Sequence, residues 1–265
     1  MYLTIINDCN DPLTMNRQVV RAITLFPDYQ ISSVGVGSFA DLEASGVIID
    51  TLDAALGEPG VIFANVAPRH GKAKKWVNGT PFGHIKIGKT HLFATVDGAT
   101  LSQISKYNLA KTIEVYDIPT VIDSQIKAGK FDANLRDSII NTQFRSYEFL
   151  PRVARWYLDN DKLPSETHEL KDFLKAPLAV WYIDNFGNCK TTAWASEIGH
   201  EPGKILKTQW GEIMCYAKLK DVPNGEAGLT IGSSGLGKKR FVEFVVQGDS
   251  AANRYGVKVG DKLFN

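Results

Sequence analysis

The strongest constraint on the fold is the alternation of short apolar runs with helical patterns over the first 116 residues. Residues 61–66 are almost wholly apolar, as in strands of a parallel sheet that is covered on both faces. Residues 14–25 and 39–56 carry apolar side chains at helical spacing. This rhythm predicts an α/β N-terminal domain, residues 1–160, with a mainly parallel sheet. The expected strands are 3–6, 31–36, 61–66, 85–87, 91–96 and 112–116, with a helix near 100–106.

The pattern changes after residue 160. Residues 161–175 are polar and are typical of a linker, and short strand-like runs separated by glycine turns follow from residue 176. This second part, residues 176–265, is predicted to be an all-β, barrel-like C-terminal domain. Before the linker, apolar groups within 132–159 indicate helix, with Pro151 in the first turn of a new one. The expected C-terminal strands are 178–183, 191–194, 211–218, 227–231 and 241–246.

Composition excludes several classes of function. The net charge of +1 argues against nucleic acid or an anionic membrane as a partner. Cys9, Cys189 and Cys215 have no zinc-type spacing, so neither a metal site nor a disulfide framework is expected. No run reaches the roughly 18 apolar residues of a membrane helix, and the N-terminus lacks the features of a signal peptide. We therefore expect a soluble, cytoplasmic protein.

The segment 183–188, Ile-Asp-Asn-Phe-Gly-Asn, gathers a carboxylate, a ring, a glycine and an amide at the end of an apolar strand. A cationic, flat-ringed ligand would suit this set. Asp184 would pair with the positive charge, Phe186 would stack, and Asn188 would hydrogen-bond in both directions. The same residue types also favour a simple turn, and on residue types alone the turn is the stronger interpretation.

Polar residues also follow the strands of the first half. Asp8, Asn65 and Asp97 each stand at the carboxyl end of an expected strand, where ligands bind in open α/β sheets. Together they predict a polar crevice for a small molecule. The basic segment 67–75 follows the apolar strand 61–66, and it is equally consistent with an anion or nucleophile site and with a solvated loop. His84 and His91 have no metal-type spacing and are expected to be structural.

The segment 232–239 nearly matches the phosphate loop G-x-x-x-x-G-K-[ST]. Lys239 stands where the motif needs a hydroxyl, and a strand-like run follows where the motif needs a helix. The residues 232–240 are therefore expected to form a flexible hairpin loop. Its cations Lys238, Lys239 and Arg240 could still bind a carboxylate.

These motifs resemble those of the SAM hydroxide adenosyltransferases, a family that includes the SAM-dependent fluorinases and chlorinases. The family pattern I-D-x-F-G-N-x-x-T-N matches residues 183–192 except that Thr191-Thr192 ends it, and G-N-A-A…G…G-D is similar to 248–261. The N-terminal similarity is looser, with Asn7-Asp8 where the family has T-D-F-G and 67–71 where it has D-P-G-V-G.

The resemblance implies an α/β domain and a β-barrel domain in a homotrimer. It implies that SAM sits between the N-terminal domain of one subunit and the C-terminal domain of the next, with no other cofactor. Carried over by position, Asp8 would hold the ribose hydroxyls and Asp184 the methionyl ammonium. Phe186 and Asn188 would stack on and hydrogen-bond the adenine. Lys239 and Arg240 fall near the family's carboxylate site.

The resemblance also implies a reaction, nucleophilic displacement at C5′ of SAM with methionine as the leaving group. The hydroxide-transferring branch polarises water with an Asp/Arg/His set, whose positions here hold Ala67, Lys74 and Phe144. Because Ala and Phe cannot take a proton, three alternatives remain open. These are a different catalytic set, a halide nucleophile, and binding of SAM or adenosine without turnover. The candidates for a different set are Arg69, His70, Lys74 and Asn65.

Overall fold

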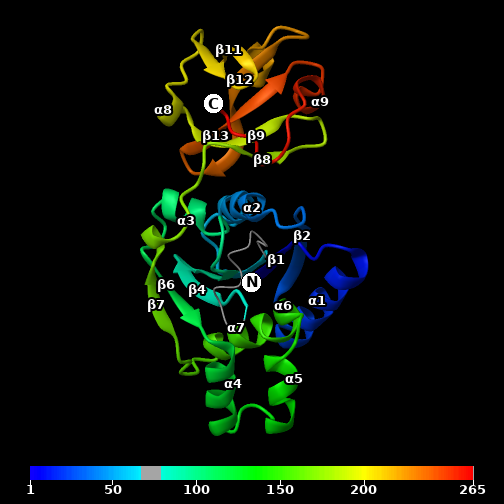
Figure 1. Cartoon of the computed structure of the whole chain (residues 1–265), viewed down its shortest axis with the longest axis vertical. Coiled ribbons are helices and arrows are strands. Elements are labelled where there is room, and N and C mark those ends of the chain that lie inside the picture. Colours follow the sequence, from blue (N-terminus) through cyan, green and yellow to red (C-terminus); the bar gives the residue numbers. More distant parts are fainter. Residues whose placement is uncertain (67–78, 265) are drawn as a thin grey trace. The chain divides into compact units, whose positions relative to one another are not determined.

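The structure is a computed structural model, and it describes residues 1–66 and 79–264. It divides into two compact units that meet in sequence between residues 175 and 176, and the short stretch Leu52–Ala54 groups with the second. We call them the N-terminal unit and the C-terminal unit, and their elements are labelled in Figure 1.

The N-terminal unit is an α/β structure. Its strands are β1 (Tyr2–Asn7), β2 (Gln30–Gly35), β3 (Gly60–Asn65), β4 (Phe82–Ile87), β5 (Thr90–Thr95), β6 (Thr112–Tyr116) and β7 (Glu166–Glu169). Its helices are α1 (Pro12–Leu25), α2 (Asp41–Ala54), α3 (Ser102–Lys106), α4 (Ile118–Lys127), α5 (Arg136–Ile140), α6 (Arg145–Glu148) and α7 (Leu150–Leu158), with 3-10 turns at Ala133–Leu135 and Leu170–Asp172.

The N-terminal sheet has the order β2-β1-β3-β5-β4-β6-β7. The expected parallel arrangement is confirmed for its core, because β2, β1, β3 and β5 are parallel neighbours. The remaining strands β4, β6 and β7 extend the sheet with antiparallel pairings. The sheet is thus mixed, with the carboxyl ends of four parallel strands at one edge, where polar ligands are expected.

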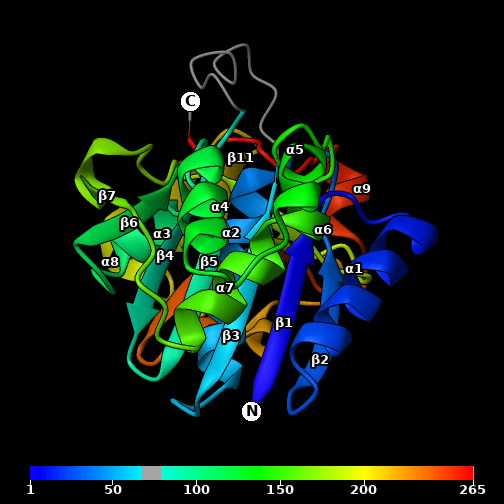
Figure 2. The same ribbon diagram turned by 90° about the horizontal axis from the view of Figure 1, so that it is seen from below.

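Helices cover both faces of this sheet, as Figure 2 shows, with α1 and α4–α7 on one side and α2 and α3 on the other. The first face buries a continuous cluster in which Leu3 and Phe63 of the strands meet Ala22 of α1, Val121 of α4 and Val153 of α7. Strand β2 lies at the sheet edge, which explains why most of its residues are exposed.

Two helices begin at aspartate caps. The Asp11 carboxylate accepts a hydrogen bond from Thr14 N at 3.0 Å and so starts α1. Asp117 accepts in the same way from Thr120 N at 3.1 Å and so starts α4, a helix that we did not predict. The aspartate cap of α4 and the proline in its first turn are nevertheless sequence features that predict the start of a helix. Pro151 lies in the first turn of α7, as predicted.

Residues 161–175, which we expected to form a linker, contain the strand β7. Its sequence Glu-Thr-His-Glu is polar because β7 pairs with β6 on one side only and is the edge strand of the sheet. Polarity alone therefore did not distinguish a linker from an exposed edge strand.

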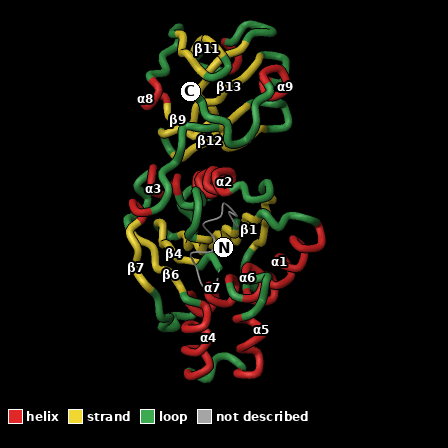
Figure 3. The backbone as a smooth tube through the Cα atoms, in the orientation of Figure 1, coloured by secondary structure: helices red, strands yellow, loops and turns green. Residues whose placement is uncertain are grey.

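The regular elements of the C-terminal unit are mainly strands, as Figure 3 shows. Its sheet has the order β10-β11-β12-β13-β9-β8, and its pairings are antiparallel except β11 with β12. The strands are β8 (Val180–Ile183), β9 (Cys189–Trp194), β10 (Ile205–Thr208), β11 (Gly211–Cys215), β12 (Ala227–Leu236) and β13 (Lys239–Val246), and the helices are α8 (Ala195–Ile198) and α9 (Ala251–Tyr255), with a 3-10 turn at Leu219–Asp221.

The backbone near Leu263 gives this sheet its barrel-like closure. Leu263 N donates to Leu178 O at 2.8 Å, and Leu263 O accepts from Gln209 N at 3.1 Å. Leu178 precedes β8 at one edge of the sheet, and Gln209 follows β10 at the other edge. One short segment thus hydrogen-bonds to both sides of the sheet, around a core in which the rings of Trp210 and Phe244 stack at 4.9 Å.

Candidate functional site

The predicted motif 183–188 forms the tight connection between β8 and β9. Asp184 N donates to Asn188 O at 3.0 Å, which closes the turn. The Asp184 carboxylate accepts three further hydrogen bonds, two from Phe186 N and Asn188 N at 2.9 Å and one from Asn188 Nδ2 at 3.0 Å. The turn interpretation of the sequence is therefore correct for Asp184, and one acceptor position on its Oδ2 is left for another group.

Gly187 brings the two C-terminal motifs together. Its φ of 82° lies in the left-handed region, and a Cβ built on it would lie 1.9 Å from Ser250 Oγ. Gly187 O also accepts a hydrogen bond from Ala252 N at 3.0 Å. The segment 248–252 therefore packs directly against the turn at 184–188, which accounts for a glycine at position 187.

Between these two motifs lies a pocket of about 530 Å³. Phe186 forms part of its wall and is 71% exposed, which is unusual for a large aromatic side chain without a partner. Within the turn, Asn188 uses one amide hydrogen and leaves the other and its Oδ1 available, so it can both donate and accept. The pocket is lined by Phe186, Asn188, Leu219, Val246, Gln247, Gly248, Asp249 and Ser250.

This pocket combines the features of a site for a flat, nitrogen-rich ring. Phe186 and Leu219 offer apolar surface, and the carboxamides of Asn188 and Gln247 offer donors and acceptors. The Asp249 carboxylate, whose Oδ1 accepts from Ser250 N at 2.7 Å, adds an acceptor with a negative charge. Asp249 and Leu219 were not among the site residues that we predicted from the sequence. Asp249 lies in the segment 248–261 that resembles the family pattern, but we gave it no role, and Leu219 belongs to no motif.

The thiol of Cys189, next to Asn188, is fully buried. Burial, followed by the negative charge of Asp184, raises the pKa of Cys189 to about 12. The thiol therefore stays protonated at neutral pH and is a poor nucleophile.

The segment 232–240 forms a hairpin, as predicted, but most of it is strand rather than loop. Strands β12 and β13 run through it and leave only Gly237 and Lys238 as the turn, with a φ of 58° at Gly237. The pairing of β12 with β13 shifts in register between Ile231 and Gly235. The glycines and serines at 232–235, which suggested a loop, lie in this irregular part of the strand. The phosphate-loop match is thereby excluded, because the motif requires a helix after the lysine.

Lys239 contacts a ring of β9, and Arg240 bonds both within the hairpin and to the carboxylate of Asp53, whose Oδ2 lies 2.7 Å from Arg240 Nη1. Lys239 Nζ lies 4.2 Å from the centroid of the Trp194 ring, a cation–π distance. Arg240 Nη1 donates to Ser233 O at 3.0 Å and to Gly235 O at 2.8 Å. The two predicted carboxylate binders thus support the hairpin in this structure.

In the N-terminal unit, Asp8 and Asn65 lie side by side at the carboxyl ends of β1 and β3, as predicted. Asp8 N donates to Asn65 O at 3.2 Å, and Asp8 Oδ2 accepts from Phe39 N at 3.3 Å. Asn65 Nδ2 donates to Oδ1 of the fully buried Asn7 at 3.0 Å. Asn7 also donates to Gln18 of α1 and so connects the Asn65 side chain to that helix; we had noted it only as part of a motif.

Three of the four candidate catalytic residues, Arg69, His70 and Lys74, lie outside the described residues, and so does Ala67. Phe144 is described and stacks on Tyr147 with ring centroids 5.3 Å apart. Its side chain is an aromatic ring among aromatic and basic neighbours, and it has no group that could transfer a proton.

Asp97, the third residue of the predicted crevice, follows β5 and accepts a hydrogen bond from Gly98 N at 3.1 Å. His84 and His91 were expected to be structural. They stack in the N-terminal sheet, with His84 Nε2 3.0 Å from His91 Nδ1, and His84 is almost fully buried. Across residues 1–66 and 79–264, no group of three or more His, Cys, Asp or Glu side chains is placed to hold a metal ion. Within the same residues, no helix has the length and apolar character needed to cross a membrane.

Comparisons with known proteins agree with this picture. Residues 178–264 match the SAM hydroxide adenosyltransferase C-terminal domain. The whole fold is similar to an uncharacterized conserved protein from Thermotoga maritima, with a TM-score of 0.69 and 16% identity over 98% of each chain. It is also similar to a conserved hypothetical protein from Thermus thermophilus, with a TM-score of 0.61 and 17% identity over 98% of this chain and 97% of the other. None of the curated proteins compared with the chain matches it.

Proposed function

We infer that this protein acts on SAM, because its residues 178–264 match the SAM hydroxide adenosyltransferase C-terminal domain. We propose more specifically that it transfers the adenosyl group of SAM to water and yields adenosine and methionine. The observation that carries the proposal is the pocket of about 530 Å³, on which both C-terminal sequence motifs converge.

The pocket suits the adenine of SAM. The exposed Phe186 ring can stack on the base, and such stacking is typically worth about 1–3 kcal/mol. The remaining amide hydrogen and the Oδ1 of Asn188 match an edge of adenine, which presents a donor beside an acceptor. The free acceptor position of Asp184 would serve the methionyl ammonium, as the family resemblance implies.

The proposal assigns the other ligand groups by the same resemblance. Asp8 would hold the ribose hydroxyls, and Lys239 and Arg240 would meet the methionyl carboxylate. These assignments require a homotrimer in which two subunits contribute to one site, and sedimentation equilibrium tests that assembly. SAM is itself the substrate, and we propose that no further cofactor takes part.

The proposed reaction is a displacement at C5′ of the ribose. The oxygen of water forms a bond to C5′ while the C5′–S bond breaks. The electron pair of the C5′–S bond goes to sulfur, which leaves as the thioether of methionine. Since the sulfonium already activates the leaving group, the protein has only to align the water, desolvate it and accept its proton. The candidates for this task are Arg69, His70, Lys74 and Asn65.

A second candidate function is binding of SAM or adenosine without turnover. The observation that favours it is Phe144, which stands at the histidine position of the hydroxide-transferring branch and packs on Tyr147. Loss of one general base commonly reduces a rate by about 10²–10⁴-fold. Halide as the nucleophile is a variant of the first proposal that requires no base.

Incubation of the full chain with SAM, followed by chromatography, separates these functions. Adenosine and methionine in equal amounts support hydrolysis, and a haloadenosine formed only with added halide supports halide transfer. Unchanged SAM together with binding heat in calorimetry supports the second function. If neither SAM nor adenosine produces heat or a thermal shift, both proposals are wrong.

Replacing Phe186 with alanine should weaken SAM binding about tenfold or more, because the stacking surface for the base is lost. Phe186 is 71% exposed, so the melting temperature should change little. The measurement is calorimetric titration with SAM. Ile205→Ala, which removes an exposed apolar side chain from β10 outside the pocket, is the matched control and should bind as the unmodified chain does. Equal affinity of the two variants would contradict the assignment of the pocket.

A further inference from the structure

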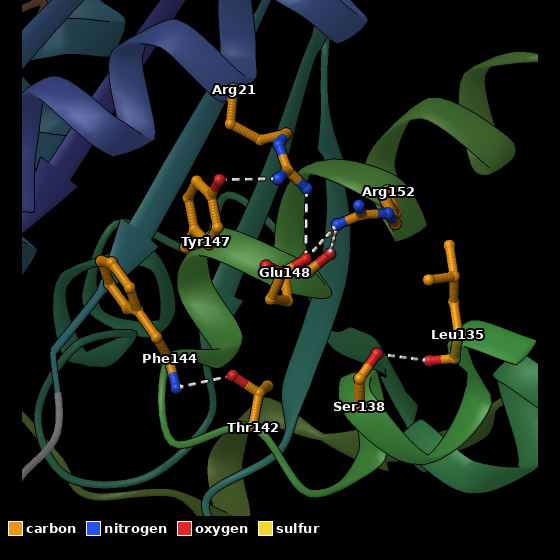
Figure 4. Close-up of polar contacts among 8 residues, drawn as sticks. All are labelled: Arg21, Leu135, Ser138, Thr142, Phe144, Tyr147, Glu148 and Arg152. Atoms are coloured by element: carbon orange, nitrogen blue, oxygen red, sulfur yellow. Dashed lines mark hydrogen bonds and ion pairs between the residues drawn. The ribbon is translucent and has the colours of Figure 1, made fainter.

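Two arginines share one carboxylate on the surface formed by α1, α6 and α7 (Figure 4). Arg21 Nη1 lies 3.1 Å and Arg152 Nη1 2.8 Å from the same atom, Glu148 Oε2. Arg21 Nη2 also donates to the hydroxyl of Tyr147 at 2.7 Å, and Arg152 donates to Glu148 O. The three charged side chains are only 18–22% exposed, so water hydrates them incompletely.

A third arginine joins this cluster over the aromatic ring of Tyr147. The guanidinium carbon of Arg17 lies 4.6 Å from the centroid of that ring, and the guanidinium carbon of Arg21 lies 4.2 Å from it. Arg17 also lies 5.3 Å from the centroid of Phe144. Among the described residues no acidic side chain forms an ion pair with Arg17, so both of its contacts are with ring faces. Arg17, Arg21, Arg152, Glu148 and Tyr147 are called the arginine cluster below.

The arginine cluster therefore carries two more positive than negative charges. Burial, followed by the charge of Arg21, lowers the pKa of Arg152, which means that the two guanidiniums repel each other. Each guanidinium has five N–H donors. Arg17 uses none of them in a hydrogen bond to a described residue, and Arg21 and Arg152 each use only part of theirs.

We propose that the arginine cluster is a binding site for a small oxyanion of the phosphate class. Guanidinium groups bind such anions with paired, charge-assisted hydrogen bonds, and the aromatic rings hold two of the guanidiniums in place. A dianion would balance the excess charge and relieve the repulsion between the arginines. The site uses none of the residues assigned to SAM, and it does not depend on the proposed function.

Calorimetric titration with inorganic phosphate at constant ionic strength tests the site. We expect saturable binding that weakens at high salt, and Arg17→Ala should weaken it about tenfold or more. Arg136→Ala is the matched control, since it removes one positive charge from an arginine that Asp123 already pairs. Its affinity should stay within about twofold of the unmodified chain.

Glu148→Gln supplies a test in the opposite direction. Removal of the shared carboxylate raises the local charge, so phosphate should bind more tightly, whereas a purely structural ion-pair network would only lose stability. If the Glu148→Gln variant does not fold, the phosphate affinity of Arg17→Ala alone tests the proposal. Titration with AMP distinguishes a free anion from a phosphate group on a nucleoside, and tighter binding of AMP supports the latter source of the same chemistry. No binding of either, or equal loss in the Arg17 and Arg136 variants, overturns the proposal.

Discussion

Replacing Gly187 with alanine should lower the free energy of unfolding of the C-terminal unit by about 2–5 kcal/mol. Two costs add at this position. A non-glycine residue at a φ of 82° carries strain of about 1–2 kcal/mol. The new Cβ would lie 1.9 Å from Ser250 Oγ and 2.9 Å from Ser250 Cα, so the segment 248–252 must move, and overpacking of this kind costs about 1–3 kcal/mol.

Urea titration followed by tryptophan fluorescence measures this effect, since Trp210 packs on Phe244 in the core of the unit. Gly225→Ala is the matched control. Its φ of 76° carries the same strain, but no atom lies within 4 Å of its Cβ position. If the two variants lose equal stability, the contact between the motifs contributes nothing and the prediction is wrong. SAM binding should fall with Gly187→Ala and stay unchanged with Gly225→Ala, because only the former displaces a wall of the pocket.

Hydrophobic patterning predicted the fold of the N-terminal unit where strands are buried, as in β3, in which every residue except Asn65 is buried. The patterning failed where a segment is exposed on one side. Strand β7 looked like a linker because its polar side chains meet solvent at the sheet edge. Helix α4 was missed although Val121, Ile122 and Gln125 form a buried stripe at helical spacing.

The candidate site was only partly predictable. Phe186 and Asn188 were named because they belong to a recognisable motif, and the structure brings them to the same pocket as residues 248–250. Leu219 lines the pocket from the separate 3-10 turn Leu219–Asp221. Local sequence patterns do not predict contacts between segments that are far apart in the chain. The glycines and serines of 232–235 indicated a loop, because these residues have low β-propensity. The structure places them in β12 at a β-bulge, which a propensity scale does not predict.

Acidification should destabilise the N-terminal unit through His84. Its ring is buried between Tyr157 and Phe93, with centroids at 3.9 and 4.6 Å, and His91 faces its Nε2. Burial, then the charges of His91 and Lys86, lower the pKa of His84 to about 3. The one carboxylate that forms an ion pair with His84 among the described residues, Glu114, is half exposed and lies 3.7 Å from Nδ1, too far to offset the burial.

The sign of the effect follows from proton binding. An unfolded histidine titrates near 6.5, so between about pH 6.5 and 3 the unfolded chain binds a proton that folded His84 does not. Stability is therefore full above pH 6.5 and falls as the pH drops toward 3, by about 2 kcal/mol at pH 5 and about 3 kcal/mol at pH 4 from this group. Urea titrations at pH 7, 5 and 4 measure the decline. His84→Gln should flatten this part of the pH dependence, while His168→Gln, at a more exposed histidine of β7, should leave it intact. A decline as steep in His84→Gln as in the unmodified chain would assign the acid sensitivity to other groups and contradict the prediction.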